Sequence, residues 1–328
     1  MMGKGKTSIG AVVIGRNEGE RLVQCLASLQ EIVGRIIYVD SGSSDGSIAA
    51  AREAGATIVE LDAASPFTAA RARTAGFLAL QKADDIPDYV QFVDGDCRMQ
   101  LDWVEAAQAA LDGDEILGIV TGWRSEVNRA HSIYNALCDF EWHRPAGVIM
   151  TCGGDMMVRS IAFDAVGGFD ETVIAAEDDE FCVRIQKAGW KIQRLPIEMT
   201  LHDAAMTHFS QWWRRAVRSG HGFAQVGDMH PEYFTKERRR VWIYGALLPF
   251  IAITGLGVSP WILTVVLGLY ALSYFRTVMG LHRNGLGKKE AFQHAVFISL
   301  SKFPNFQGIL TYKWRRFRGL KMNIIEYK

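Results

Sequence analysis

The segment Tyr89-Val90-Gln91-Phe92-Val93-Asp94-Gly95-Asp96 decides the fold. Four of its first five residues are apolar, which is typical of a buried strand, and the strand runs directly into two carboxylates one residue apart. We interpret Asp94 and Asp96 as side chains that converge at a site-forming edge of a sheet. Carboxylate oxygens of this kind hold Mg²⁺ or Mn²⁺, and such an ion neutralises a diphosphate.

The rest of the first hundred residues alternates short apolar runs with amphipathic stretches. This alternation predicts βαβ units and an α/β fold with a mostly parallel sheet and flanking helices. Ligands of such sheets bind beyond the carboxyl ends of the strands, where Asn17-Glu18, Asp40–Asp45 and Asp94–Asp96 all fall. The predicted strands are 9–14, 35–39, 57–61, 89–93, 116–121, 190–195 and 199–202, and the predicted helices are 18–31, 47–54, 68–82, 101–111, 161–166, 178–188 and 211–220.

The net charge of zero hides a strong asymmetry along the 328 residues. Residues 211–328 carry 18 Lys and Arg against 5 Asp and Glu, whereas residues 1–210 carry 18 against 31. A basic C-terminal part is expected to face something anionic, such as lipid headgroups or nucleic acid. The five cysteines are scattered without a Cys-x-x-Cys pair, which indicates a reducing compartment and argues against a disulfide framework or a structural zinc site.

Two apolar runs, 242–258 and 261–280, almost exclude charge. The second is long enough to span a bilayer and the first is marginal. Arg238-Arg239-Arg240 precedes them and Lys288-Lys289 follows, so the positive-inside rule predicts a hairpin at about 241–280 with both ends cytosolic. A buried pair of core helices or a re-entrant segment is the alternative. The aromatic and basic segment 314–318 fits either an interfacial anchor or a solvated tail.

A second acidic group, Glu177-Asp178-Asp179-Glu180, begins a predicted helix. The helix dipole favours one or two acids at this end, but four clustered like charges repel one another, and burial raises the pKa of at least one. A carboxylate placed in this way is suited to act as a general base on a hydroxyl group.

The order of these motifs resembles that of the family 2 glycosyltransferases, which have the GT-A fold. The resemblance covers roughly residues 8–225 and is carried by Val12–Glu18, Val39–Ser47, Ala70–Phe77, Val93–Asp96 and Gly167–Asp170 with Glu177-Asp178. It implies a catalytic domain at residues 1–225, and leaves residues 226–328 as a membrane-associated helical region with the apolar hairpin and a basic amphipathic tail.

The resemblance also implies a nucleotide-sugar donor and roles for individual residues. Asn17, Glu18 and Asp40 would hold the nucleoside, and Arg71 and Arg73 would lie near the nucleotide or its diphosphate, because guanidinium groups pair well with phosphate. Three residues would bind the metal ion: Asp96 as the direct ligand, Asp94 as a ribose or shared metal contact, and His202 as the ligand that completes the shell in some members.

Asp178 matches the general base of the family, with Asp179 as its alternative. Glu177, Asp179 and Asp155 are assigned to the acceptor or diphosphate side, where Asp155 replaces a common Asn. Gln211, Arg214 and Arg215 resemble the Gln-x-x-Arg-Trp motif of processive members, with Arg215 in place of the Trp, so processivity is not carried over. Ser41 replaces a second Asp, so the nucleotide base is not carried over either.

The resulting prediction is an inverting single displacement. Asp178 accepts the proton of an acceptor hydroxyl, the metal at Asp96 stabilises the departing diphosphate, and Arg214 or Arg215 adds positive charge. The membrane hairpin argues for a lipid-linked acceptor in polysaccharide or glycolipid synthesis, at the cytoplasmic face of the membrane.

Two alternatives to a transferase stay open. A sugar-nucleotide nucleotidyltransferase would need a Gly-rich phosphate loop, which Gly15-Arg16-Asn17-Glu18-Gly19 matches poorly, and a catalytically idle membrane scaffold would keep the fold only for binding. A Rossmann dehydrogenase is excluded because no Gly-x-Gly-x-x-Gly follows the first strand. A nucleic-acid binder leaves the apolar runs unexplained, so no nucleic-acid partner is expected.

Overall fold

The computed structural model describes residues 8–30, 32–82 and 86–326, which fall into two compact units. The first unit comprises the chain up to Arg129 together with Cys138–Ala205, and the second comprises Ala130–Leu137 and Met206–Lys328. Along the chain the compact units divide at 205/206, and the predicted domain boundary at 225/226, which stays a prediction, lies within the continuous helix α8 (Phe209–Met229).

In the described part of the chain, the first unit is built on a sheet of nine strands in the order β3-β2-β1-β4-β8-β6-β9-β5, with β7 paired to β9. The strands are β1 Ile9–Gly15, β2 Arg35–Asp40, β3 Thr57–Glu60, β4 Tyr89–Asp94, β5 Cys97–Met99, β6 Leu117–Glu126, β7 Gly147–Val148, β8 Met156–Arg159 and β9 Lys191–His202. Its helices are α1 Glu20–Ala27, α2 Ser47–Glu53, α3 Ala69–Gln81, α4 Trp103–Gly113, α6 Ser160–Ala165 and α7 Glu177–Lys187. The 3₁₀ turn η1 is Arg129–His131, and α5, Ile133–Trp142, is divided between the two units.

The sheet is parallel throughout its first half and mixed in its second half. Strands β3, β2, β1 and β4 pair in parallel, as predicted, whereas β8 runs antiparallel to both β4 and β6. The predicted strands 190–195 and 199–202 are a single strand, β9, which runs parallel to β6 with register shifts. The short strands β5, β7 and β8 were not predicted. The predicted end of the first helix at Glu31 lies outside the described residues.

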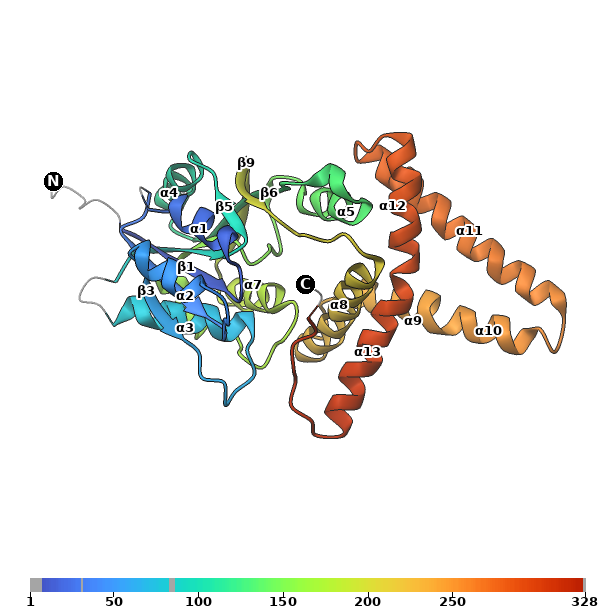
Figure 1. Cartoon of the computed structure of the whole chain (residues 1–328). Coiled ribbons are helices and arrows are strands. Elements are labelled where there is room, and N and C mark those ends of the chain that lie inside the picture. Colours follow the sequence, from blue (N-terminus) through green and yellow to red (C-terminus); the bar gives the residue numbers. More distant parts are fainter. Residues whose placement is uncertain (1–7, 31, 83–85, 327–328) are drawn as a thin grey trace. The chain divides into compact units, whose positions relative to one another are not determined.

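Both faces of the sheet are covered by helices, which explains why its central strands are apolar throughout. In β1, Ala11 and Val13 pack in the core with α1 and α4, while Val12 and Ile14 pack on the opposite face with α3, α6 and α7. Figure 1 shows α3 on the side of the sheet opposite α1 and α4. Gly76 allows α3 to approach closely, because a Cβ there would lie 2.3 Å from Val12 Cγ1. The strand ends are therefore held rigidly from both sides.

The second unit is helical. Besides α8 it contains α9 Thr235–Trp242, the π-helical segment η2 Ile243–Leu247, α10 Leu248–Gly255, α11 Pro260–Arg283, α12 Lys288–Leu300 and α13 Lys302–Phe317. Helices α8 and α13 cross at two glycines, since a Cβ at Gly220 or at Gly308 would lie 2.0 Å from the backbone of the other helix.

Helices α10 and α11 form the predicted hairpin, and within the described residues α11 is the one helix long and apolar enough to cross a membrane. Only 11% of its most apolar window is buried, so the structure does not support the alternative of a buried core pair.

Candidate active site

The parallel register brings the acidic strand ends to one edge of the sheet. Gly15 at the end of β1 pairs with Asp40 at the end of β2, and Ile14 pairs with Asp94 at the end of β4. Asp40 and Asp94 therefore lie at the same edge, on either side of the loop that carries Asn17 and Glu18. The structure brings together the predicted residues of three separate segments.

Asp40 and Asn17 order the loop after β2. The buried Asp40 carboxylate accepts hydrogen bonds from the amides of Gly42 and Ser43, at 2.9 and 2.8 Å, and from the hydroxyl of Tyr38 at 3.0 Å. Asn17 has a positive φ of 55° and accepts a hydrogen bond from the amide of Ser44 at 2.8 Å. The two side chains shape a polar, backbone-lined wall beside the turn of Asp94.

Glu18 follows Asn17 in the same loop, and its side chain lies beside Arg21 and Gly95. Its carboxylate forms an ion pair with Arg21 at 2.8 Å, and its Cγ lies against Gly95, where an added Cβ would come within 3.3 Å. Gly95 thus lets the 94–96 turn lie close to the loop after β1.

Arg73 on α3 is the centre of the site. Its guanidinium is 3% exposed, donates to Asp94 Oδ1 at 2.8 Å and to Glu177 Oε1 at 2.9 Å, and lies over the ring of Phe169. Burial alone would lower the pKa of Arg73, but Asp94 and Glu177 raise it above its ordinary value. Gly154 makes room for this group, since a Cβ there would lie 2.0 Å from Arg73 Nη2. Arg73 therefore joins the 94–96 turn to the start of α7.

Asp155 lies beneath the site and is 1% exposed. Its Oδ1 accepts the amide of Asp94 at 3.0 Å, and its Oδ2 lies 2.7 Å from Arg124 Nη2 and accepts the hydroxyl of Thr200 at 2.9 Å. Both oxygens are thus engaged within the protein. Arg124 in turn approaches Asp94 Oδ2 at 3.8 Å. Burial would raise the pKa of Asp94, but Arg73 and Arg124 hold it below its ordinary value.

Asp96 and His202 form a second cluster. Asp96 Oδ1 lies 3.3 Å from His202 Nε2, and the ligand atoms of Asp96, Cys97 and His202 all lie within 4.8 Å of one another. The other ring nitrogen of His202, Nδ1, is buried, has no hydrogen-bond partner and lies 4.0 Å from Glu126 Oε2. The indole of Trp142 packs edge-on against the imidazole, with ring centroids 4.6 Å apart.

The acidic start of α7 lies on the other side of Arg73. Ala176 precedes the helix with a positive φ of 59°, and Asp178 Oδ1 accepts the amide of Asp179 at 2.9 Å. Asp178 has no ion-pair partner among the described cations, whereas the neighbouring Glu177 binds Arg73 and Glu180 binds Arg184. Burial, followed by the charges of Glu177 and Asp179, raises the pKa of Asp178 to about 8.

Arg71 lies apart from this network. Its Nη1 donates to the carbonyls of Asp62 and Ser65 in the loop before α3. Gln211, Arg214 and Arg215 lie on α8 in the second unit, where Gln211 Oε1 accepts the amides of Thr207 and His208 at the start of the helix. Their predicted role at the diphosphate stays a prediction.

Four contributors to the two clusters were not predicted: Arg124, Glu126, Trp142 and Cys97. Cys97 was adjacent to the Asp-Gly-Asp triplet and could have been included as a neighbour of Asp96. The others come from β6 and α5, where single residues in apolar or mixed surroundings carry no recognisable motif.

Two family models match the chain, "Glycosyl transferase family 2" over residues 11–161 and "Glycosyl transferase family group 2" over residues 89–297. The second match covers more than half of the chain. The chain therefore belongs to the family 2 glycosyl transferases, and the predicted family is confirmed.

Two proteins of similar sequence are also named as glycosyltransferases. The pre-mycofactocin glycosyltransferase of Mycobacterium tuberculosis is 28% identical over 274 residues, which is 78% of this chain and 55% of the relative. The probable glycosyltransferase YdaM of Bacillus subtilis is 24% identical over 143 residues, 40% of this chain and 34% of the relative. The chain spans about half the length of the first of these relatives.

Among solved structures, the mannosyltransferase PcManGT from Pyrobaculum calidifontis in complex with GDP-Man and Mn²⁺ has a similar fold. Its TM-score is 0.61 at 15% identity, over 95% of this chain and 89% of that one. At this identity the likeness concerns the fold alone, and it confirms the predicted GT-A architecture.

Proposed function

We propose that this protein transfers a sugar from a nucleoside-diphosphate sugar to a hydroxyl acceptor, with inversion at the anomeric carbon. The observation that carries the proposal is the Arg73 bridge, in which one buried guanidinium bonds both Asp94 and Glu177. It ties the diphosphate side of the site to the helix start that bears Asp178, as a single displacement requires.

A divalent cation fits the second cluster. Asp96 offers an oxygen and His202 a nitrogen only 3.3 Å apart, and Glu126 lies behind the other imidazole nitrogen, as a residue that orients a ligating histidine would. Mg²⁺ or Mn²⁺ bound there would neutralise charge on the leaving diphosphate. Asp94 Oδ1 is bound to Arg73, so we assign Asp94 a shared contact, to the ion or the ribose, through its other oxygen.

Asp178 supplies the general base. In its ionised form it accepts the proton of the acceptor hydroxyl as the oxygen attacks the anomeric carbon and the bond to the diphosphate breaks. Its lack of an ion-pair partner favours this role over Glu177, which is bound to Arg73, and leaves Asp179 as the competitor.

The remaining predicted residues take supporting roles in the proposal. Asn17, Glu18 and Asp40 form the nucleoside wall, and Arg71 acts by ordering the loop of Asp62 and Ser65. Asp155 is a positioning residue, because it holds Arg124 and the amide of Asp94 rather than facing an acceptor.

The proposal is tested with a panel of nucleoside-diphosphate sugars, GDP-mannose among them, supplied with Mn²⁺ or Mg²⁺ and membrane lipid extract. The released nucleoside diphosphate and the stereochemistry of the product are measured. Metal-dependent release with at least one donor and an inverted product is expected. The absence of transfer from every donor would contradict a transferase and favour a scaffold.

Asp96→Asn is expected to weaken Mn²⁺ binding by about tenfold or more, because it removes a charged ligand while the fold keeps an amide of the same size. Calorimetric titration of Mn²⁺ measures the affinity, and nucleoside diphosphate release measures turnover. Asp62→Asn, in the loop before α3, is the control. Unchanged Mn²⁺ affinity in the Asp96 variant would place the ion elsewhere.

We further propose that the protein is anchored at the cytoplasmic face of a membrane and acts on a lipid-linked acceptor in polysaccharide or glycolipid synthesis. The exposed apolar surface of α11 supports the anchor, and the cations on both flanks of the α10–α11 hairpin support the cytosolic orientation. In this proposal residues 1–225 form the catalytic domain and 226–328 the membrane-associated region.

The double substitution Leu269→Arg and Leu272→Arg is expected to release the protein from membranes washed with alkaline carbonate. Both leucines are exposed on α11, and each arginine at the centre of a bilayer-spanning helix costs roughly 2.5–3.5 kcal/mol. Leu78→Arg, at a similarly exposed position on α3, should leave the distribution unchanged. Retention of the double variant in the washed pellet would contradict anchoring by α11.

A further inference from the structure

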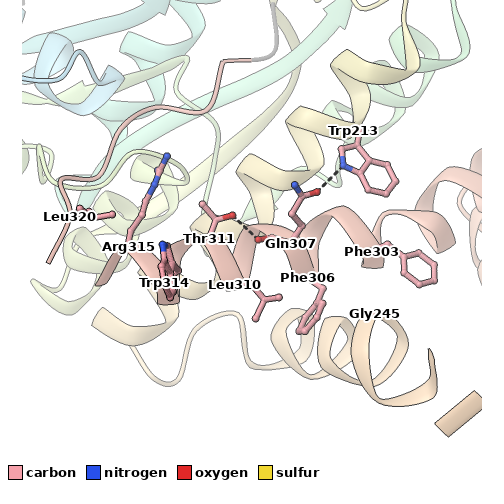
Figure 2. Close-up of a pocket in the computed structure, with 10 residues that line it drawn as sticks. All are labelled: Trp213, Gly245, Phe303, Phe306, Gln307, Leu310, Thr311, Trp314, Arg315 and Leu320. Carbon is pink, nitrogen blue, oxygen red and sulfur yellow. Dashed lines mark hydrogen bonds between the residues drawn. The ribbon is translucent and has the colours of Figure 1, made fainter. Parts of the chain in front are cut away.

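A groove lies along α13 in the second unit, with a volume of about 570 Å³. This is within the range of roughly 300–1,000 Å³ typical of ligand sites. Figure 2 shows its lining, which comes from α13, from the segment after α13 that carries Leu320, from η2 and from α8. The apolar residues that form it are Trp213, Phe303, Phe306, Leu310, Trp314 and Leu320.

Several polar groups of the groove are already hydrogen-bonded, and among them Arg315 Nη1 donates to the carbonyl of Asn323 at 2.8 Å. Gln307 Oε1 accepts the indole N–H of Trp213 at 2.9 Å, and the Thr311 hydroxyl donates to the carbonyl of Gln307 at 2.8 Å (Figure 2). A polar ligand such as a sugar would find few free hydrogen-bonding groups in this lining. A hydrocarbon chain, in contrast, needs none.

One end of the groove is cationic. Arg315 lines it, and the guanidinium of Arg318 lies 5.4 Å from the ring centroid of Trp314. The segment 302–321 contains six Lys and Arg and no Asp or Glu. An anionic group is therefore favoured beside the apolar channel.

The other end reaches the membrane hairpin. Gly245 of η2 lines the groove and packs so closely on α13 that an added Cβ would lie 2.4 Å from the carbonyl of Lys302. The segment η2 leads directly into α10 and then α11. The groove thus runs from the start of the apolar hairpin to the basic end of α13.

We propose that this groove binds an acyl chain of an anionic membrane phospholipid, with the phosphate beside Arg315. The inference rests on the membrane association in the proposed function, but not on the transfer reaction. It adds a second attachment to the bilayer, which holds α13 at the lipid surface while α11 enters the apolar layer.

The test uses the full chain in lipid nanodiscs that contain phosphatidylglycerol or phosphatidylcholine with brominated acyl chains. Bromine quenches an indole that it touches, and the contribution of Trp314 is the difference between the wild type and Trp314→Phe. We expect quenching of Trp314 at a lower mole fraction of brominated phosphatidylglycerol than of phosphatidylcholine. Arg315→Gln should reduce this preference about fivefold, as the loss of one cation near an anionic lipid surface implies.

Leu310→Glu should abolish the quenching of Trp314, because it places a carboxylate on the groove wall at a site already 46% exposed. Leu78→Glu, at a site 49% exposed on α3, is the matched control for folding, and in this variant bromine should quench Trp314 as it does in the wild type. The proposal would be overturned if Trp314 were quenched in neither lipid or equally in both. It would also be overturned if Trp314 were shielded from bromine only in nanodiscs that hold two copies of this chain, because a second copy would then cover the groove. Quenching of Trp314 as expected, in a protein that transfers no sugar from any donor, would support the lipid-binding groove and contradict the proposed function.

Discussion

Replacing Asp178 by Asn is expected to lower kcat/KM by about 10²–10⁴-fold, the usual contribution of a general base. The amide has the same shape but cannot accept the proton of the acceptor hydroxyl. The substitution leaves the Arg73 bridge intact, since that bridge uses Glu177. Release of nucleoside diphosphate and binding of the donor are measured on the same preparation, and donor affinity should change little.

The dependence of kcat/KM on pH in the wild type should also report the ionisation of Asp178. Because the base works only when ionised, kcat/KM is expected to rise with pH through a value near 8 and then to level off. An ordinary aspartate would give a profile already flat above about pH 5. A flat profile between pH 6 and 9 would contradict Asp178 as the base.

Asp178→Asn should also stabilise the fold. A carboxyl whose pKa is raised by folding contributes stability below its unfolded pKa of about 3.9 and loses that contribution as pH rises through about 8. The variant is therefore expected to melt a few degrees above the wild type at pH 9, and the difference should shrink toward pH 4. Asp179→Asn is the matched control, and if it loses activity while Asp178→Asn retains it, Asp179 is the base.

The sequence was sufficient to predict where the acids meet. Asp40 and Asp94 each end an apolar strand, and parallel pairing puts such ends at one edge whatever the rest of the chain does. The start of α7 was recognisable for a similar local reason, because four consecutive acids stand out from any ordinary helix terminus. Strand ends and charge runs are local signals, so a single sequence contains them.

Contacts between distant segments could not be predicted in the same way. Arg71 and Arg73 were indistinguishable in the sequence, yet their side chains leave α3 in different directions, and only Arg73 reaches Asp94. Asp155 was assigned to the acceptor, whereas its carboxylate is buried against Arg124, a residue on a strand 31 positions earlier. These outcomes depend on packing between α3, β6 and β8, which periodicity does not report.

The C-terminal region shows the same division. The apolar lengths of α10 and α11 predicted the hairpin, but the course of α8 past residue 225 depends on its packing against α13. Gly220 and Gly308 make that crossing possible, and they lie 88 positions apart in the sequence. Two isolated glycines gave no indication that they meet.

Arg73→Met is expected to destabilise the first unit by about 3–5 kcal/mol, the usual cost of removing one partner of a buried ion pair. Methionine keeps most of the length and apolar stem but leaves Asp94 and Glu177 without the cation they share. Chemical denaturation followed by circular dichroism measures the change. Arg71→Met, two residues earlier on the same helix, removes only bonds to exposed loop carbonyls and should cost about 1 kcal/mol or less.

The pH dependence separates lost charge from lost packing in this variant. Arg73 holds the pKa of Asp94 below its ordinary value, so the stabilisation by Arg73 is present above the unfolded pKa of about 3.9 and is lost as pH falls further. The deficit of Arg73→Met should therefore be largest near pH 7 and smaller at about pH 3, where the wild type has begun to lose this contribution. Adding Glu177→Gln should recover part of the stability, because it removes one of the two uncompensated charges. A deficit that is the same at both pH values and unaffected by Glu177→Gln would mean that Arg73 acts through its packing against Phe169, and that charge does not hold the bridge between Asp94 and Glu177.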